Sequence, residues 1–303
     1  MRDITGVKQN LRSYGGLACL KVGITLDGKN YLVKFPGNLK AKNLKNIDLS
    51  YSNGSVCEYL GSHIFEQFGL PTHHTELATR DGKLVVMCED FIHPGMRLAE
   101  FRELKATYEP AFVNAAGEVT DGVGSDLQEA LLVIRNHPTF QYVPEAEKFF
   151  WKMFIIDAFI GNPARNNGNW GLLIINDEKV EIAPIYDNGN GLNNKWDDAK
   201  MQKCLSDEQM LKAEVSTGKV CFFTQDDKRL NPFKVIESAE YPMCTEVLHE
   251  LMNHVELPNI LTLIDECDTL TDVQRLFYRT ILSMRFEKLQ DIAKSYMKPI
   301  GAF

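Results

Sequence analysis

The stretch FFWKMFIIDAFIGNPARNNGNWGLLII, residues 149–175, joins three kinds of sequence. An apolar run typical of a buried helix leads into a loop, residues 161–171, and an apolar run typical of a strand follows it. The amide side chains of this loop are those of Asn162, Asn166, Asn167 and Asn169. Ala164 lies in the middle of the loop and has no functional group. A simple connection does not need so many amides, so the loop is a candidate ligand site.

A hairpin is predicted directly after the loop, with its turn at Asn176-Asp177 and its returning strand ending at Asp187. In such a hairpin, Asn169 and Asp187 lie at the same end. An amide oxygen and a carboxylate at one point suit Mg²⁺ bound together with a phosphate. The alternative is that Asp187, which precedes NGNG, only initiates a turn.

The first ~90 residues are predicted to form strands and one helix, because apolar alternation is punctuated by two Asp-Gly hairpin signals. The helix is expected over SVCEYLGSHIFEQFG, residues 55–69. Ser55 and Glu58 have the spacing of a capping box at its start. Glu58 could also pair with a cation on the preceding strand.

Two features ahead of that helix could bind an anion. Gly15 and Gly16 form a predicted turn between two strands, where backbone N–H groups could approach a phosphate, although a tight turn explains them as well. Lys34 follows the apolar run YLV. It is either a solvated charge on an edge strand or a fixed cation, with Glu58 as its potential partner.

From about residue 95 onward, helical patterns dominate. We expect helices over LAEFRELKATY, DLQEALLVIRNH and EAEKFFWKMFIIDAFIG, and a mostly helical remainder after the hairpin. The predicted layout is a β-rich lobe, residues 1–92, and a helical lobe, residues 93–303, with a ligand expected in a cleft between the two.

Composition excludes several classes of protein. The net charge of −8 argues against broad binding to nucleic acids or membrane surfaces, and the longest apolar runs are too short to span a bilayer. The beginning of the chain lacks the apolar core of a signal peptide, so classical export is not expected. The seven cysteines include no CxxC pair, which favours reduced thiols over a disulfide scaffold or a zinc site.

The order of these elements is glycine turn, strand lysine, helix glutamate, loop asparagine, hairpin and aspartate. It resembles the order of the phosphoryl-transfer groups in protein kinases. The stretches YLVKFP, EYLGSHIFEQFGLP, VVMCEDF, DAFIGN…NGNWG and IAPIYDNG are similar to those of HipA-type serine/threonine kinases, and above all to the compact members of that family, which include a cell-translocating kinase.

The resemblance implies an α+β, two-lobed protein-kinase-like fold that uses ATP and Mg²⁺. It implies that Lys34 contacts the nucleotide phosphates, near the glycine turn and Glu58. It also implies that the backbone of Glu89 and Phe91 holds the adenine and that Tyr186 lies near the nucleotide. Asn169 and Asp187 would bind Mg²⁺.

The main departure from the family lies five residues before Asn169, where the family has its catalytic aspartate and this chain has Ala164. Two explanations stand side by side: an inactivating substitution introduced into an active kinase, or a natural loss that leaves a nucleotide-binding pseudokinase acting through a partner. In either case catalysis is expected to be impaired in this form.

The resemblance also bears on partners and location. The implied partner is a protein substrate with a serine or threonine hydroxyl, and autophosphorylation is expected. The chain lacks the N-terminal subdomain of the longer toxins of the family, so an antitoxin partner is not expected, and neither are direct nucleic-acid or membrane contacts. A cytoplasmic protein is expected, with export or translocation into a host cell by a non-classical route left open.

Overall fold

The computed structural model describes residues 1–15, 19–38, 52–109, 112–113, 119–120, 124–216, 218, 220–222 and 229–296. Gly16 of the predicted glycine turn lies outside the described residues. The chain divides into two compact units. The first comprises residues 1–93, 184–212 and 256–281, and the second comprises residues 94–183, 213–255 and 282–303. The assignment of residues 1–92 and 93–303 to two lobes stays a prediction.

A five-stranded sheet with the order β1-β4-β5-β3-β2 forms the centre of the first unit. Its strands are β1 (Arg2–Asp3), β2 (Lys21–Leu26), β3 (Lys29–Lys34), β4 (Thr75–Arg80) and β5 (Lys83–Glu89). Both Asp-Gly hairpins are confirmed, because β2 pairs with β3 and β4 with β5 in antiparallel register. Asp27 and Asp81 adopt φ near +50°, as a tight hairpin turn requires.

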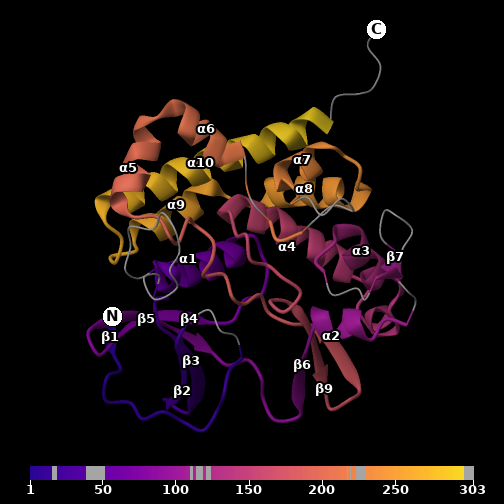
Figure 1. Ribbon diagram of the computed structural model, residues 1–303, viewed down its shortest axis with the longest axis horizontal. Helices are drawn as coiled ribbons and strands as arrows, with labels where there is room; N and C mark the ends of the chain where they lie inside the picture. Colours follow the sequence, from indigo (N-terminus) through magenta and orange to yellow (C-terminus); the bar gives the residue numbers. More distant parts are fainter. Residues whose placement is uncertain are drawn as a thin grey trace. The chain divides into compact units, whose positions relative to one another are not determined.

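Helix α1 (Gly54–Gln67) packs against β4 and β5 of this sheet (Figure 1). Its predicted capping box is wrong. The N-cap is Asn53, which makes no side-chain cap, and the Ser55 hydroxyl donates to the Leu84 carbonyl at 3.4 Å. Glu58 is buried and bonded elsewhere, because tertiary contacts outcompete the local cap. The helix ends as predicted, with Gly69 at φ +77°.

The edge-strand interpretation of Lys34 is also wrong. Strand β3 lies inside the sheet, between β5 and β2, and Lys34 is 8% exposed. Tyr31 and Val33 of the same strand belong to the apolar core on the other face. A lysine in this position is a buried cation that needs partners.

Helices from later in the sequence complete the first unit. They are α5 (Asp198–Ser206), α9 (Leu257–Asp265) and the first part of α10 (Asp272–Tyr296). Helix α9 packs on α1. These helices agree with the mostly helical remainder that was predicted after the hairpin.

A three-stranded sheet with the order β10-β9-β6 lies in the second unit. Its strands are β6 (Met96–Glu100), β9 (Gly171–Ile175) and β10 (Lys179–Ile182). The helix predicted over LAEFRELKATY is therefore only half correct. Its first residues pair with β9 as β6, and α2 begins at Phe101, because the backbone ladder to β9 outweighs local helix propensity.

The predicted turn of the hairpin after the loop is confirmed, but the prediction that its returning strand ends at Asp187 is wrong. Asn176 and Asp177 both adopt positive φ between β9 and β10. Strand β10 ends at Ile182, however, and Asp187 lies beyond it, in the first unit. Pro184 explains this early end, because proline has no N–H to continue a ladder.

Helix α4 (Ala146–Ile160) is the centre of the second unit and is buried over most of its length. It packs against α3 (Leu127–Asn136), α7 (Pro232–Glu237) and α8 (Pro242–His254). Gly161 ends α4 in the left-handed conformation, at φ +67°. The remaining elements of the second unit are β7 (Phe112–Val113), β8 (Val119–Thr120), the 3-10 helix Pro138–Tyr142 and α6 (Glu208–Ser216), which begins in the first unit.

Among the described residues, no helix is both long enough and apolar enough to cross a membrane.

Candidate functional site

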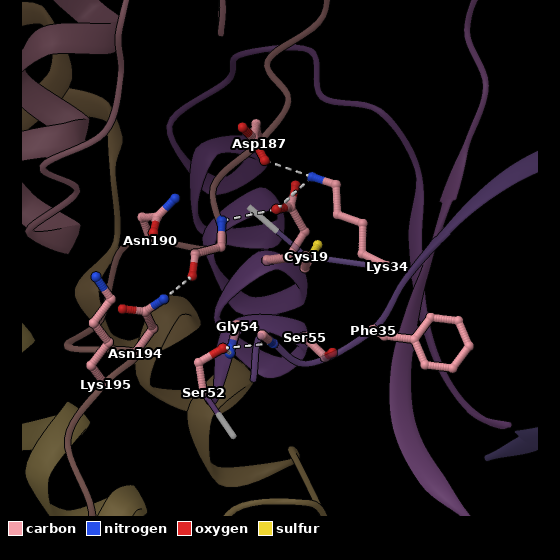
Figure 2. A pocket seen from close by; sticks show the side chains of 13 residues that line it. Cys19, Lys34, Phe35, Ser52, Gly54, Ser55, Asp187, Asn190, Asn194 and Lys195 are labelled. Carbon is pink, nitrogen blue, oxygen red and sulfur yellow. Dashed lines mark hydrogen bonds and ion pairs between the residues drawn. The ribbon is translucent and has the colours of Figure 1, made fainter. Parts of the chain in front are cut away.

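A cavity in the first unit is lined by residues from three parts of the sequence (Figure 2). One part is the end of β3 and the residues near it, one is the start of α1 with the residues just before it, and one is the segment from Asp187 onward. The lining residues are Cys19, Lys34, Phe35, Gly37, Ser52, Gly54, Ser55, Glu58, Asp187, Gly189, Asn190, Asn194 and Lys195. The lining side chains with full charges are those of Lys34, Glu58, Asp187 and Lys195. Figure 2 shows the Lys34 ammonium directed at the Asp187 carboxylate.

Lys34 bridges two carboxylates. Its Nζ lies 2.9 Å from Oε2 of Glu58 and 2.8 Å from Oδ1 of Asp187. Burial by itself would lower the pKa of Lys34, but the two carboxylates hold that pKa well above its usual value. The residue is therefore a permanent cation held in one position by two opposite charges.

Glu58 is 1% exposed and every oxygen of its carboxylate is bonded. Oε2 accepts from Lys34 and, at 2.8 Å, from the backbone N–H of Gly189. Oε1 lies 3.0 Å from Nε2 of His73. Burial would raise the pKa of Glu58, but Lys34 and His73 hold it below its usual value, so the carboxylate is ionised.

Asp187 is the more accessible carboxylate, with 30% of its side chain exposed. Lys34 holds its pKa below the usual value, against the opposing effect of burial. Its backbone adopts φ +60°, which aspartate tolerates better than most residues. An ionised and partly open carboxylate of this kind is a suitable ligand for a hard cation.

Sequence reasoning missed His73, and its neighbour Cys88 extends the same buried group. One ligand atom each of Glu58, His73 and Cys88 lies within 4.8 Å of the others. The bond between Glu58 and His73 accounts for two of these residues, and burial raises the pKa of the Cys88 thiol. All seven cysteines are free thiols. The sequence signal for His73 was the pair of adjacent histidines before β4.

The residues expected to contact the adenine lie near one another in the first unit. Glu89 ends β5, and its backbone N–H donates to the His74 carbonyl at 2.8 Å. The Phe91 ring lies 5.8 Å from the ring of Tyr186, measured between centroids. The two aromatic residues are half-buried, so a flat ring system could reach them. Their roles at the nucleotide stay a prediction.

Gly15 lies in an irregular segment before β2, and its carbonyl accepts from Nζ of Lys21 at 2.7 Å. The turn was predicted to lie between two strands. Within residues 4–15 the structure shows an isolated bridge from Gln9 to Ile24 in place of a strand, so that part of the prediction is wrong.

The asparagine-rich loop in the second unit is anchored on a buried ion pair. Arg165 and Asp157 are both nearly fully buried, and Nε of Arg165 lies 2.8 Å from Oδ2 of Asp157. Asn162 donates to Oδ1 of the same carboxylate at 2.8 Å. Burial raises the pKa of Asp157, although Arg165 and Asn162 oppose that shift. The loop is thus tied to the last turns of α4.

Three of the four amide side chains, those of Asn162, Asn166 and Asn169, hold the backbone of Ala164. Its N–H donates to Oδ1 of Asn162 at 3.1 Å, and its carbonyl accepts from Nδ2 of Asn169 at 2.8 Å. That carbonyl also accepts from the backbone N–H of Asn166 at 2.7 Å and from its Nδ2 at 3.2 Å. The asparagines therefore fix the loop itself, and the Cβ of Ala164 has a set position.

Asn169 is oriented by the same network. Because its Nδ2 donates to Ala164, its Oδ1 is the amide atom that can bind a cation. Asn169 belongs to the second unit and Asp187 to the first, so a shared metal site for this pair stays a prediction.

No family model matches the chain. The serine/threonine-protein kinase CtkA of Helicobacter pylori is 30% identical over 285 residues, which are 93% of this chain and 84% of the relative. The crystal structure of a proinflammatory kinase CtkA from H. pylori matches with a TM-score of 0.86 at 30% identity and covers 97% of both chains. HipA of Shewanella oneidensis, solved with HipB and operator DNA, matches with a TM-score of 0.54 at 12% identity, over 96% of this chain and 68% of the other. This last match concerns the fold alone.

Proposed function

The chain belongs to the HipA-like serine/threonine kinases of compact, CtkA-like form, and from this premise we propose that it binds ATP with Mg²⁺ and transfers the γ-phosphate to protein hydroxyls at a rate that Ala164 limits. The observation that carries the proposal is the buried bridge from Lys34 to Glu58 and Asp187 at the end of a cavity. Kinases place a strand lysine, a helix glutamate and a metal-binding aspartate in this relation.

The residues at the cavity fit a nucleotide with its metal. Lys34 supplies a permanent positive charge for phosphate oxygens, and ionised Asp187 supplies a hard ligand for Mg²⁺. Gly189 gives space beside them, because a Cβ on this residue would lie 3.0 Å from Oε2 of Glu58. When bound, the metal neutralises charge that develops on the transferring phosphoryl group.

Each chain residue has a distinct task in this proposal. Glu58 holds Lys34 so that the ammonium does not have to be ordered when the phosphates arrive. Asp187 would be a ligand of the metal, and the Asn169 amide oxygen is the second proposed ligand. Phe91 and Tyr186 offer apolar surface to the adenine, next to the backbone that ends β5. Protein substrates with serine or threonine hydroxyls are the proposed acceptors.

The missing group is the general base at position 164. An aspartate there would accept the proton of the substrate hydroxyl, which a methyl group cannot do. Asn166 and Asn167 do not replace it, because an amide is not a base at neutral pH and both side chains already bond the backbone. Binding of Mg·ATP is therefore expected to survive while transfer is slow.

A second candidate function is a pseudokinase that binds nucleotide and acts by docking a partner. The observation in its favour is that the backbone N–H and carbonyl of Ala164 are both bonded although position 164 carries no carboxylate. Both functions predict nucleotide binding, so activity of a restored variant distinguishes them.

The test is Ala164→Asp. The backbone of residue 164 is already fixed, so the new carboxylate needs no rearrangement of the main chain, and transfer of phosphate should rise by at least ~10²-fold. The measurement is incorporation of labelled γ-phosphate into protein, including the chain itself, where exposed Ser13 is a candidate acceptor. Ala164→Asn, which adds similar volume without a base, is the matched control. Mg·ATP binding without transfer in the aspartate variant would favour the pseudokinase.

A further inference from the structure

His73 is a buried histidine to which the proposed catalytic steps give no task. It is 5% exposed, and its Nε2 lies 3.0 Å from Oε1 of Glu58. The low pKa of Glu58 keeps that carboxylate an acceptor. Nε2 therefore has to carry the hydrogen and donate it.

The backbone around His73 is bonded to the segment that leads to Asp187. The His73 N–H donates to the Ile185 carbonyl at 3.1 Å, and the Ile185 N–H donates to the Pro71 carbonyl at 2.8 Å. Thr72 and Ile185 form a parallel bridge between these two hydrogen bonds. Asp187 follows two residues later, at the end of a backbone that this bridge holds.

We propose that His73 is a positioning residue that holds both carboxylates on Lys34, Glu58 through its imidazole and Asp187 through its main chain, and thereby sets the affinity for Mg·ATP. The consequence for nucleotide affinity rests on the proposed function. The positioning itself concerns contacts among residues of one compact unit.

The physical reason lies in how the ammonium of Lys34 is shared. Its two carboxylates lie at nearly the same distance, 2.9 Å and 2.8 Å. Without a donor from His73, Oε1 of Glu58 would be a buried acceptor with no partner, which is costly for a charged group. Glu58 would then turn or take up a proton, and Lys34 would be drawn towards Asp187. Asp187 would have less negative charge left for a metal, and Lys34 would be less directed at phosphate.

The next residue provides a natural control. His74 also contacts a carboxylate, with 3.1 Å between its Nε2 and Oε1 of Glu76, but this pair is exposed on the surface of β4. Exposed ion pairs contribute little, so loss of the His74 side chain should leave nucleotide binding unchanged.

The experiment compares His73→Leu, His73→Gln and His74→Leu by calorimetric titration with ATP in Mg²⁺. His73→Leu removes the donor and is expected to weaken binding by about tenfold, because the bond that is lost goes to a charged group. His73→Gln keeps an N–H donor at similar reach and should recover most of the affinity. A leucine at position 73 could impair folding. Circular dichroism therefore checks that each variant is folded, and the glutamine variant tests the role of the donor in a side chain that stays polar.

The Lys34→Ala background separates positioning from general destabilisation. If His73 acts through Glu58 on Lys34, then His73→Leu should cost no further affinity in Lys34→Ala, and the two effects should be non-additive. An equal tenfold loss in that background overturns the proposal, and so does unchanged affinity in His73→Leu alone.

A measurement without nucleotide tests the positioning role even if the proposed function fails. If the parent chain binds no Mg·ATP, the kinase proposal fails, whereas the positioning proposal still predicts coupling. His73→Leu should then reduce the coupling energy between Lys34 and Glu58 in urea denaturation at least twofold, and His74→Leu should not. An equal coupling energy between Lys34 and Glu58 in the parent, in His73→Leu and in His74→Leu overturns the positioning role.

Discussion

Replacing Lys34 with methionine is expected to lower the free energy of unfolding by about 3–5 kcal/mol, because it leaves buried Glu58 without its cation. The double-mutant cycle with Glu58→Gln isolates the pair. At 2.9 Å and an effective dielectric constant of about 20, the Coulomb energy is about 6 kcal/mol, and desolvation offsets much of it. We expect a coupling energy of about 2–3 kcal/mol, the upper part of the usual range, since both side chains are at least nine-tenths buried.

Urea denaturation of the parent, both single variants and the double variant measures this coupling. The pH dependence of the coupling energy follows from the shifted pKa values of Lys34 and Glu58. The raised pKa of Lys34 contributes stability that is present below the ordinary lysine value, about 10.4, and is lost as the pH rises through the folded value. The lowered pKa of Glu58 contributes stability that is present above about 4.3 and is lost as the pH falls through the folded value. The coupling should therefore be constant between about pH 5 and 10 and fade in acid. A coupling below about 0.5 kcal/mol at pH 7 would refute the buried bridge.

Two further predictions concern Asp187 and the loop. Asp187→Ala should abolish the part of ATP affinity that depends on Mg²⁺, since the carboxylate is the main charge offsetting the ion. Calorimetry with and without Mg²⁺ measures this difference. Unchanged affinity in Mg²⁺ would mean that Asp187 is only a turn residue. Arg165→Met should destabilise the protein by about 3–5 kcal/mol, because buried Asp157 is left without its cation. Arg102→Met on the surface should change stability by less than about 1 kcal/mol. Denaturation midpoints compare the two arginine variants, and similar losses for both would contradict the anchoring role of the buried pair.

Local sequence signals predicted the elements whose chemistry is local. The Asp-Gly hairpins, the end of α1 at Gly69 and the end of α4 at Gly161 are all correct, because glycine, asparagine and aspartate tolerate the positive φ that these turns need. The order of Lys34, Glu58, Asn169 and Asp187 along the chain suggested the site because it resembles the order of the phosphoryl-transfer groups in protein kinases. Each of these residues taken alone also had a structural explanation.

Tertiary contacts decided what the sequence could not predict. The spacing of Ser55 and Glu58 favours a capping box, yet Glu58 pairs with Lys34. Leaving a buried cation unpaired costs more free energy than leaving the start of the helix without a side-chain cap. The pattern of LAEFRELKATY predicts a helix from Leu98, and only pairing with β9 makes residues 98–100 part of a strand. His73 carried no signal beyond a pair of histidines, because its partner is fifteen residues away in sequence.

The bonds around Ala164 have an evolutionary consequence. Its main chain is held by neighbouring asparagines, and its side chain contributes nothing to that hold. Alanine and aspartate codons that end in a pyrimidine differ by a single base. One point mutation can therefore remove or restore the proton acceptor while the scaffold around it stays intact. Selection for folding and selection for turnover act on different residues of this loop. A lineage could therefore lose phosphotransfer, keep the fold for another purpose, and later regain the chemistry.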